Sequence, residues 1–350
     1  MSASTNAPQP PAASSQSSHQ PSLGSFFETM RAFQRTEALK TALELEIFTA
    51  IGEGKTTANA IAERSNASLR GIRTLCDFMV TIGFLAKSGN NYALTPDSAL
   101  FLDRRSPAYA GGAVRFLASP MLTEPYKRLT EAVRKGGTTA GAGTVAPEHP
   151  IWIDFAHAMA PMAAMPAEML VNLVAASMPS KPRVLDIAAG HGLFGIAFAK
   201  RFPGASVTAV DWANVLEAGK ENAFRAGVQD RYRTIAGSAF EVDLGGVYDI
   251  VLITNFLHHF GVSANERFLH RIHEAMAPGG RAITLEFIPN EDRVTPAQAA
   301  QFSMEMLAGT PEGDAYTFSE LQTMFSNAGF SSTTMHELPP TFFRALVSNR

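Results

Sequence analysis

The amino-acid sequence predicts an α/β protein in which a mainly helical N-terminal part precedes a parallel β-sheet covered by helices on both faces. Short runs rich in Val and Ile alternate with helix-like stretches in the C-terminal half, which is typical of a parallel sheet. A helix, a turn, a second helix and a hairpin follow one another in the N-terminal part. The chain has 350 residues, and at roughly 150 residues per domain this length suggests about two domains.

The composition favours a folded protein with little net charge. Apolar residues make up 46% of the chain and charged residues 17%, enough for sizeable cores. The 29 Lys and Arg nearly balance the 32 Asp and Glu, so the net charge of -3 gives little attraction to nucleic acid or an anionic membrane. The single cysteine, Cys76, excludes an intrachain disulfide. We therefore expect a cytoplasmic protein without nucleic-acid or membrane partners.

The N-terminal part is predicted to contain a leader and a winged helix. Residues 1–24 are rich in Ser, Ala, Pro and Gln and lack the parts of a signal peptide, so we expect a disordered leader. Apolar residues then recur at helical spacing from Phe26, a short helix opens at Thr56, and a second helix and a hairpin over residues 84–94 follow. Residues 25–104 thus fit a winged-helix domain.

This predicted winged helix favours packing or dimerisation over DNA binding. Arg70 and Arg73 lie on its second helix, but nearby Glu63 and Asp77 dilute the positive charge. The long N-terminal helices carry more apolar surface than one winged helix needs to cover itself. We therefore expect a homodimer.

Residues 105–178 are predicted to form a helical linker and the helices of a substrate pocket. A Gly-, Thr- and Pro-rich loop over residues 136–150 has the composition of a hinge, and one long helix is expected over residues 151–178. In residues 179–350 we expect seven strands. The last two are joined at Pro339-Pro340 without a helix between them, so the final strand is expected to return antiparallel, unlike an ordinary dinucleotide fold.

A glycine-rich turn follows the first predicted strand of this domain. The segment from Val184 to Gly192 runs a buried strand into glycines, where a ligand can lie against bare backbone. The string from Gly190 to Gly195 also fits GxGxxG, which several nucleotide-type ligands share. Asp186 would repel a pyrophosphate but suits an amino group and a sulfonium, and Asp211 closes the next strand, where an acid can hold two ribose hydroxyls. These residues, with Trp212 placed to lie along an adenine, point to S-adenosylmethionine. The alternative is a turn-capping Asp186 in a sugar or nicotinamide enzyme.

A histidine follows the strand YDIVLIT at the sheet edge where ligands bind in open α/β folds. Methyl transfer from a sulfonium needs the acceptor oxygen held in line, and imidazole is the natural base for its proton near neutral pH. His258 is therefore the candidate base. Two alternatives remain open: a hydrogen-bonded core histidine, or a metal site formed with His259, His270 and His273. No carboxylate cluster accompanies these histidines, so we expect no metal.

With these motifs the chain resembles the class I S-adenosylmethionine-dependent methyltransferases, in particular the small-molecule O-methyltransferase family of the caffeate and hydroxyneurosporene type. The resemblance extends from Phe26 to the end of the chain and implies a winged-helix dimerisation domain before a Rossmann-like, seven-stranded methyltransferase domain. It places Asp186, Gly190 and Gly192 at the methionine end of the cofactor and Asp211 at its ribose. The expected cofactor site comprises Asp186, Gly190, Gly192, Asp211, Trp212, Gly237, Ser238, Phe240 and Asn255.

The resemblance also shows where this chain departs from the family. The family motif Gly-Asp-Met-Phe, which flanks the adenine, is here Gly237-Ser238-Ala239-Phe240, so Asp243 is the alternative acid. The resemblance assigns the base to His258 and an orienting acid to Glu286, and His259 stands where the family often has aspartate. A second orienting acid would fall at Ala315. Either Asp314 or Glu312 substitutes for it, or Glu286 acts alone.

The acceptor is expected to be a small aromatic or polyketide-like phenol. The residues assigned to its apolar slot are Phe155, Met159, Met162, Phe256 and Met304. Carbon or nitrogen methylation remains an alternative on the same fold. Two further alternatives are a nicotinamide oxidoreductase, supported by GxGxxG, and a winged-helix regulator that senses S-adenosylmethionine.

Overall fold

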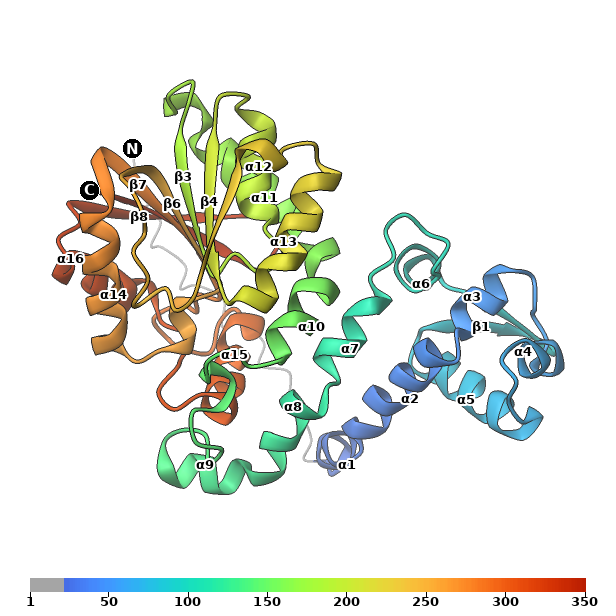
Figure 1. Cartoon of the computed structure of the whole chain (residues 1–350). Helices are drawn as coiled ribbons and strands as arrows, with labels where there is room; N and C mark the ends of the chain where they lie inside the picture. The colour runs from blue at the N-terminus through green and yellow to red at the C-terminus, as the bar shows by residue number, and fades with distance from the viewer. Residues whose placement is uncertain (1–21) are drawn as a thin grey trace, which may run out of the picture.

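The computed structural model describes residues 22–350. The leader predicted over residues 1–24 lies outside these residues except for its last three. The described chain forms an N-terminal helical region beside a larger α/β region, with short helices connecting the two (Figure 1).

The N-terminal region contains the predicted helices and hairpin. Thr57 and Ser68 begin two of its helices, and each side chain accepts a hydrogen bond from the backbone N–H three residues later. Its core consists mainly of apolar side chains from the second to fifth helices and the hairpin, among them Ile47, Phe48 and Ile72. The elements are α1 (Gly24–Met30), α2 (Ala32–Glu44), α3 (Ile47–Gly52), α4 (Ala58–Arg64), α5 (Leu69–Thr81), β1 (Leu85–Ser88), β2 (Asn91–Leu94) and α6 (Pro96–Phe101).

The connecting segment differs from the prediction in one important respect. In place of a single helix over residues 151–178, the chain forms α10 (Ile151–Ala158) and α11 (Ala160–Val174), bent by 69°. Pro161 explains the break, because it has no N–H to continue a helix and its ring favours a first-turn position. Before them lie α7 (Val114–Leu117), α8 (Pro120–Thr123) and α9 (Leu129–Lys135).

The α/β region is built on a seven-stranded sheet, which confirms the predicted fold class. Its order is β5-β4-β3-β6-β7-β9-β8, and β9 runs antiparallel to both of its neighbours, as predicted. The remaining pairs are parallel. The strands are β3 (Arg183–Ile187), β4 (Ser206–Asp211), β5 (Tyr232–Ala236), β6 (Tyr248–Thr254), β7 (Met276–Glu286), β8 (Ser332–Glu337) and β9 (Arg344–Asn349).

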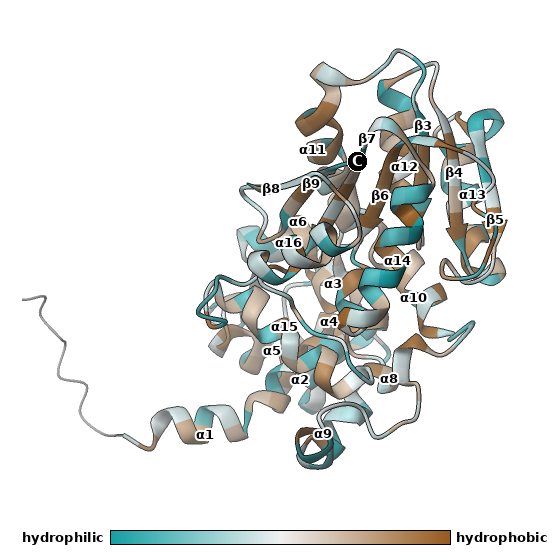
Figure 2. Ribbon diagram, turned by 90° about the vertical axis from the view of Figure 1, so that its left-hand side faces the viewer, coloured by the Kyte–Doolittle hydropathy of each residue, from teal (hydrophilic) through white to brown (hydrophobic). Residues whose placement is uncertain are grey.

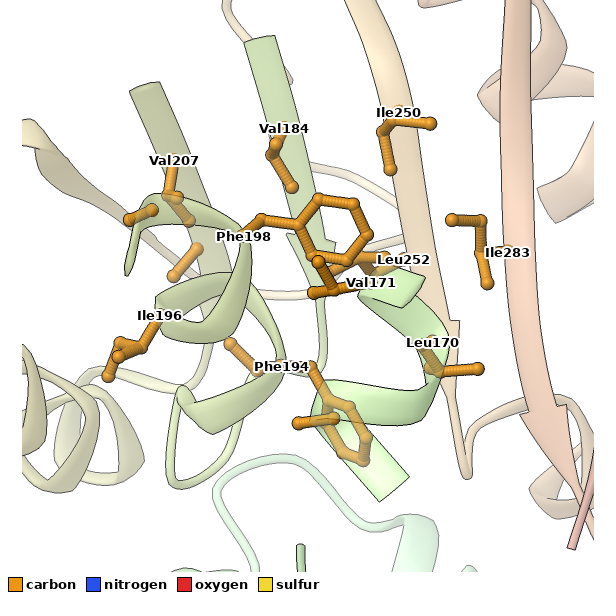
Figure 3. Close-up of a cluster of buried hydrophobic side chains, with 14 of the residues drawn as sticks. Leu170, Val171, Val184, Phe194, Ile196, Phe198, Val207, Ile250, Leu252 and Ile283 are labelled. Carbon is orange, nitrogen blue, oxygen red and sulfur yellow. The ribbon is translucent and has the colours of Figure 1, made fainter. Parts of the chain in front are cut away.

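Helices cover both faces of the sheet. Alternate strand residues such as Val184, Ile250 and Ile283 pack against α11 and α12 on one face (Figure 3). The intervening residues, such as Leu185 and Val251, pack against α14 and α16 on the other face. Each fully buried side chain of this kind stabilises the fold by roughly 1.5–3 kcal/mol. The helices are α12 (Leu193–Arg201), α13 (Ala213–Arg225), α14 (Val262–Glu274), α15 (Ala297–Gly309) and α16 (Phe318–Asn327).

Within residues 22–350 no single helix is both long enough and apolar enough to span a membrane, and only the bent pair Ile151–Ala158 and Ala160–Ser177 is so by length and composition. Leu170 and Val174 of that pair lie in the core against the sheet.

Candidate active site

The turn after β3 has the backbone geometry that its glycines allow. Gly190 and Gly192 have φ angles of 55° and 73°, in the left-handed region. A Cβ atom on Gly192 would stand 2.4 Å from the hydroxyl oxygen of Tyr232, and one on Gly195 would stand 2.8 Å from Oδ2 of Asp186. The sequence therefore needs glycine here both for the turn and for the close approach of α12 to β3.

Asp186 is a buried carboxylate with one free oxygen. Its Oδ2 accepts a hydrogen bond of 2.9 Å from the backbone N–H of Gly195, whereas its Oδ1 has no hydrogen-bond partner among residues 22–350. Burial raises the pKa of Asp186 to about 7, and the nearby charge of Asp211 adds to this effect. A buried oxygen of this kind calls for a donor or a cation from a bound molecule.

Asp211 ties the end of β4 to the glycine turn. Its Oδ2 accepts from the backbone N–H of Gly190 at 2.8 Å, and its Oδ1 accepts from that of Trp212 at 2.7 Å. Each carboxylate oxygen can accept a second hydrogen bond, so two hydroxyls can still bind. Burial raises the pKa of Asp211 to about 6, and the two amide donors oppose this rise.

The residues at this edge of the sheet fit S-adenosylmethionine better than a dinucleotide. The buried hydroxyl of Tyr232 and Oδ1 of Asn255, like Asp186 Oδ1, have no hydrogen-bond partner in the described part of the chain. Burial raises the pKa of Tyr232 well above its usual value, and the carboxylates of Asp186 and Asp211 raise it further. Two buried carboxylates would repel a pyrophosphate, whereas they favour an ammonium, a sulfonium and ribose hydroxyls.

The residues expected at the adenine lie close to Asp211, and their role toward the adenine stays a prediction. The backbone N–H of Gly237 donates to the Asp211 carbonyl at 2.9 Å, and Ser238 Oγ accepts from the N–H of Phe240 at 3.3 Å. Trp212 packs against the contact between α10 and α13. Asp243, the alternative acid, is exposed and accepts from the N–H of Gly245.

His258 and Glu286 form a buried pair at the carboxyl ends of β6 and β7. Glu286 Oε2 is hydrogen-bonded to His258 Nδ1, and its Oε1 accepts from the backbone N–H groups of Phe256 and Leu257 at 3.0 and 2.9 Å. His258 is 4% exposed and Glu286 is 3% exposed. Because a carboxylate that holds Nδ1–H leaves Nε2 as the acceptor, Glu286 fixes the tautomer that a general base requires.

The other ring nitrogen of His258, Nε2, lies against the ring of His259. His258 Nε2 lies 3.1 Å from His259 Nε2. His259 Nδ1 is buried and has no hydrogen-bond partner within the described residues. The Trp152 ring packs edge-on against His259 with 5.0 Å between ring centroids, and its indole N–H donates to the Thr144 carbonyl at 3.0 Å. Burial lowers the pKa of His259 well below its usual value, and the neighbouring His258 lowers it further.

The acids considered as substitutes at Ala315 do not serve His258. Asp314 pairs with Arg293 at 3.0 Å, and Glu312 is exposed beside Gly261. Ala315 itself is fully buried. His258 is therefore held by Glu286 on one side and faces His259 on the other.

Histidine clusters that could hold a metal were also considered. In residues 22–350 no group of three or more His, Cys, Asp or Glu side chains could hold a metal ion. His270 instead faces Glu274 of its own helix at 3.5 Å, and His273 packs edge-on against Phe330. The absence of a metal stays a prediction.

The models of two known protein domains match this chain. The model of the O-methyltransferase domain matches residues 126–331, and the model of the O-methyltransferase dimerisation domain matches residues 27–104. The first match alone covers more than half of the chain. The chain belongs to the O-methyltransferase family.

Individual relatives of this O-methyltransferase agree in fold and length. A tetracenomycin polyketide synthesis 8-O-methyltransferase from Streptomyces glaucescens is 28% identical, over 88% of this chain and 91% of its own length. A 3-hydroxy-5-methyl-1-naphthoate 3-O-methyltransferase from Streptomyces sahachiroi is also 28% identical, over 85% and 86%. A solved structure of a candidate O-methyltransferase from Nostoc punctiforme has a TM-score of 0.91 at 52% identity, covering 95% of this chain and all of its own. The human N-acetylserotonin methyltransferase, solved with S-adenosylmethionine, has a TM-score of 0.82 at 22% identity, covering 95% and 99%.

The residues expected to hold the acceptor of this O-methyltransferase lie in different surroundings. Phe155 stacks on His191 beside the glycine turn, and Phe256 packs in a buried cluster with three other phenylalanines. Met159 lies at the bend between α10 and α11, so the expected stripe along one helix is interrupted. Met162 and Met304 are 40% and 44% exposed. Their roles toward the acceptor stay predictions.

The structure adds Phe287, which sequence reasoning missed, beside His258 and the pocket candidate Phe302. Phe302 of α15 packs edge-on against His258 at 4.7 Å between ring centroids and stacks on Phe287 at 3.8 Å. Phe342 and Phe343 extend this aromatic group. The adjacent pair Phe342 and Phe343, which follows Pro339-Pro340 in the sequence, is the signal that could have indicated this group.

Glu305 is the other residue that was missed. Burial raises the pKa of this half-buried carboxyl, and the charge of His258 partly opposes the rise. It lies one helical turn from Phe302, on the helix that flanks His258. A single acid inside the apolar stretch SMEML is the signal that could have drawn attention to it.

Proposed function

We propose that this O-methyltransferase methylates a hydroxyl of a small aromatic or polyketide-like molecule, with His258 as the general base. The observation that carries the proposal is the buried His258–Glu286 pair, which stands at the same sheet edge as the unpaired Oδ1 of Asp186. Parallel β3, β6 and β7 bring their carboxyl ends together, so a methyl donor and a base can act on one oxygen.

The enzyme is S-adenosylmethionine-dependent, and this cofactor supplies an electrophilic methyl group on a sulfonium when it is bound. In our proposal Asp186 Oδ1 and the glycine turn hold its amino-acid end, and Asp211 accepts from its ribose hydroxyls. Because these groups are backbone amides and buried carboxylates tied to each other, they bind with little rearrangement.

His258 takes up the proton that the acceptor loses. Its Nδ1–H is held by Glu286, whose other oxygen is fixed by two backbone N–H groups, so the imidazole keeps one orientation. The imidazolium that forms is stabilised by the adjacent carboxylate. General-base assistance of this kind contributes about 10²–10⁴-fold to the rate.

A flat aromatic acceptor suits the surroundings of the base. The rings of Phe302 and Phe287 stack beside His258, and Trp152 lies on the side of His259. Aromatic walls with few polar groups are typical of pockets for small apolar molecules. The two Streptomyces relatives carry a polyketide and a naphthoate in their names, which supports this class of acceptor.

A labelled-methyl screen tests the proposal. Purified enzyme and S-adenosylmethionine carrying a labelled methyl group are incubated with phenols, naphthols and hydroxylated polyketides, and mass spectrometry locates the label in each product. We expect label on oxygen with the wild type and a loss of about 10²-fold or more with His258→Asn. Label on carbon or nitrogen would replace the O-methylation proposal, and an equally active variant would remove His258 as the base.

We also propose that the enzyme is a homodimer. Four large apolar side chains of α1 and α2 are at least half exposed in the single chain, namely Phe26, Phe27, Met30 and Phe33. The helix α1, which carries the first three, projects from the rest of the molecule (Figure 2), and all but Phe26 lie within the residues matched by the dimerisation-domain model. Burying such a surface against a second copy is the usual reason for its presence.

Light scattering tests the dimer. The wild type is expected to have the mass of two chains, and Met30→Glu combined with Phe33→Glu is expected to shift it toward one. The matched control is Phe224→Glu, a substitution at a 71% exposed phenylalanine of α13. A stable wild-type monomer would contradict this proposal. The cytoplasmic location and the absence of nucleic-acid and membrane partners stay predictions.

A further inference from the structure

The geometry points to His259 as the residue that first accepts the proton of the acceptor hydroxyl and relays it to His258. This inference rests on the proposed function, because it divides the work of the base between two histidines. It starts from the contact of 3.1 Å between the two Nε2 atoms. One of these nitrogens must donate and the other must accept.

The direction of this hydrogen bond follows from Glu286. The carboxylate takes the Nδ1–H of His258, so a neutral His258 has a bare Nε2 that can only accept. The proton in the contact therefore belongs to His259 Nε2. Burial and the neighbouring imidazole keep His259 neutral, so its other nitrogen, Nδ1, carries no proton.

The bare nitrogen of His259 is the open end of this chain of hydrogen bonds. His259 Nδ1 is buried and has no partner among the residues that the structure describes. Trp152, which packs against the His259 ring, cannot supply a donor because its only N–H is held by the Thr144 carbonyl at 3.0 Å. A buried acceptor nitrogen between aromatic walls calls for an O–H from a bound molecule.

The arrangement also explains how His258 can act although its Nε2 is already hydrogen-bonded. If the acceptor bound to His258 directly, His259 would first have to leave this nitrogen. In the relay the contact stays in place, and it is the means by which the proton reaches His258. The chain is thus acceptor oxygen, His259, His258 and Glu286.

The transfer balances in atoms and charge. The acceptor oxygen forms a bond to the methyl carbon, and the bonding pair of the broken carbon–sulfur bond stays on sulfur. The O–H proton moves to His259 Nδ1, and the Nε2 proton of His259 moves to His258 Nε2. His259 ends as the other neutral tautomer, and His258 ends as an imidazolium beside the Glu286 carboxylate. Loss of one proton to water and return of His259 to its first tautomer complete the cycle.

A nitrogen-15 spectrum of the histidine rings tests the tautomers directly. Protein labelled at histidine is examined at neutral pH with bound S-adenosylhomocysteine, and His259→Asn and His270→Asn identify the signals. We expect His258 protonated at Nδ1 and His259 protonated at Nε2. A His259 ring protonated at Nδ1 would overturn the relay, because that nitrogen could not take a proton. This readout needs no acceptor, so it stands or fails apart from the proposed O-methylation.

Kinetics with His259→Asn provide the second test. Asparagine fills a similar position and can form hydrogen bonds, but it cannot pass a proton from one atom to another. We expect kcat to fall about 10²-fold or more with the fastest phenol of the screen and to recover by at least tenfold relative to wild type with its more acidic nitro-substituted counterpart. Affinity for S-adenosylhomocysteine should stay within twofold of the wild type.

The controls distinguish a relay from a structural role. His270→Asn changes an exposed histidine of α14 and should leave every value unchanged. An equal loss with both phenols would show that His259 only supports the pocket, and an unchanged kcat would show that His258 accepts the proton directly. Either result would overturn the inference.

Discussion

The two halves of the site are built in different ways. The proposed cofactor side has its two carboxylates on two short stretches, residues 186–195 and 211–212, where backbone N–H donors fix them. The acceptor side combines side chains from four separate segments, with Trp152, His259, Glu286 and Phe302 in one group. The cofactor side is therefore a local sequence motif, whereas the acceptor side forms only when distant segments of the chain fold together.

Their electrostatics also differ. Burial on the cofactor side raises the pKa of Asp186 and Asp211 to about 7 and about 6, so these acids favour a bound cation and hydroxyl donors. Burial on the acceptor side lowers the pKa of His259 and keeps it neutral. One half is thus suited to holding a charged molecule and the other to moving a proton. Substitutions should separate these two tasks.

The largest expected effect comes from the acceptor side. Glu286→Gln removes the carboxylate that fixes the tautomer of His258 and stabilises its imidazolium, while keeping the size of the side chain. We expect kcat to fall by about 10²–10⁴-fold with the affinity for S-adenosylmethionine nearly unchanged. Steady-state rates and calorimetric titration measure the two quantities. If the affinity for S-adenosylmethionine fell as much as kcat, the two halves of the site would not have separate tasks.

Asp211→Ala should act mainly on the binding of S-adenosylmethionine. It removes hydrogen bonds to the ribose and also frees the N–H groups of Gly190 and Trp212. Since a hydrogen bond to a charged group is worth about 1.5–3 kcal/mol, we expect the dissociation constant of S-adenosylmethionine to rise by about 10–100-fold. Calorimetric titration measures it, with NAD as the control ligand. Wild-type binding of NAD in place of S-adenosylmethionine would favour the oxidoreductase alternative.

The pH dependence of S-adenosylmethionine binding tests the role of the Asp186 carboxylate on the cofactor side. A cation binds the ionised form of Asp186, whose pKa of about 7 in the free protein should fall on binding. Affinity should therefore rise with pH up to about 7 and decline by about tenfold per pH unit below it. Asp186→Asn should flatten this profile. Calorimetric titrations with S-adenosylmethionine between about pH 5.5 and 8.5, a range around this pKa, measure the profile. A wild-type affinity that does not change with pH would contradict this role of Asp186.

The same carboxyl affects stability with the opposite sign. Its folded-state pKa lies above the unfolded value of 3.8, so the free folded protein binds more protons than the unfolded chain between these values. This contribution to stability is complete below the unfolded pKa and is lost as the pH rises through about 7. Thermal unfolding with and without S-adenosylhomocysteine should show the largest ligand stabilisation at the higher pH.

The smallest expected effect concerns the glycine turn. Gly190→Ala places alanine at a φ of 55° with an ordinary contact of 3.7 Å to Phe155, so we expect a loss of about 1–2 kcal/mol in the free energy of unfolding. Gly192→Ala should lose more, because its Cβ would also meet the Tyr232 hydroxyl at 2.4 Å. The control is Gly227→Ala, with a similar φ and open space. Equal losses at all three positions would remove the packing argument.

The difference between the halves also explains what the sequence could predict. The strands, the glycine turn and the antiparallel end of the sheet depend on neighbouring residues, so periodicity and spacing indicated them. The long helix over residues 151–178 was a wrong prediction, because Pro161 lacks the N–H that would continue α10 and instead stands in the first turn of a new helix. The position of His258 at a strand end was visible because parallel strands end at one edge.

The partners of the base could not be predicted in the same way. Glu286 was proposed from the family resemblance, but the contact of His259 with His258 depends on the turn of residues 257–259. Glu305 reaches the site only through the folding of α15 onto the sheet edge. Its separation from His258 in the sequence carries no signal of that proximity.

The most direct test of the central claim is a single-turnover measurement with enzyme-bound, methyl-labelled S-adenosylmethionine and the best phenol of the screen. Wild type and His258→Asn are loaded with cofactor to the same extent and mixed with the phenol, and the appearance of labelled ether is followed. We predict transfer to oxygen that is slower by about 10²-fold or more in the variant. Equal rates in the two proteins at equal cofactor occupancy would contradict the assignment of His258 as the base.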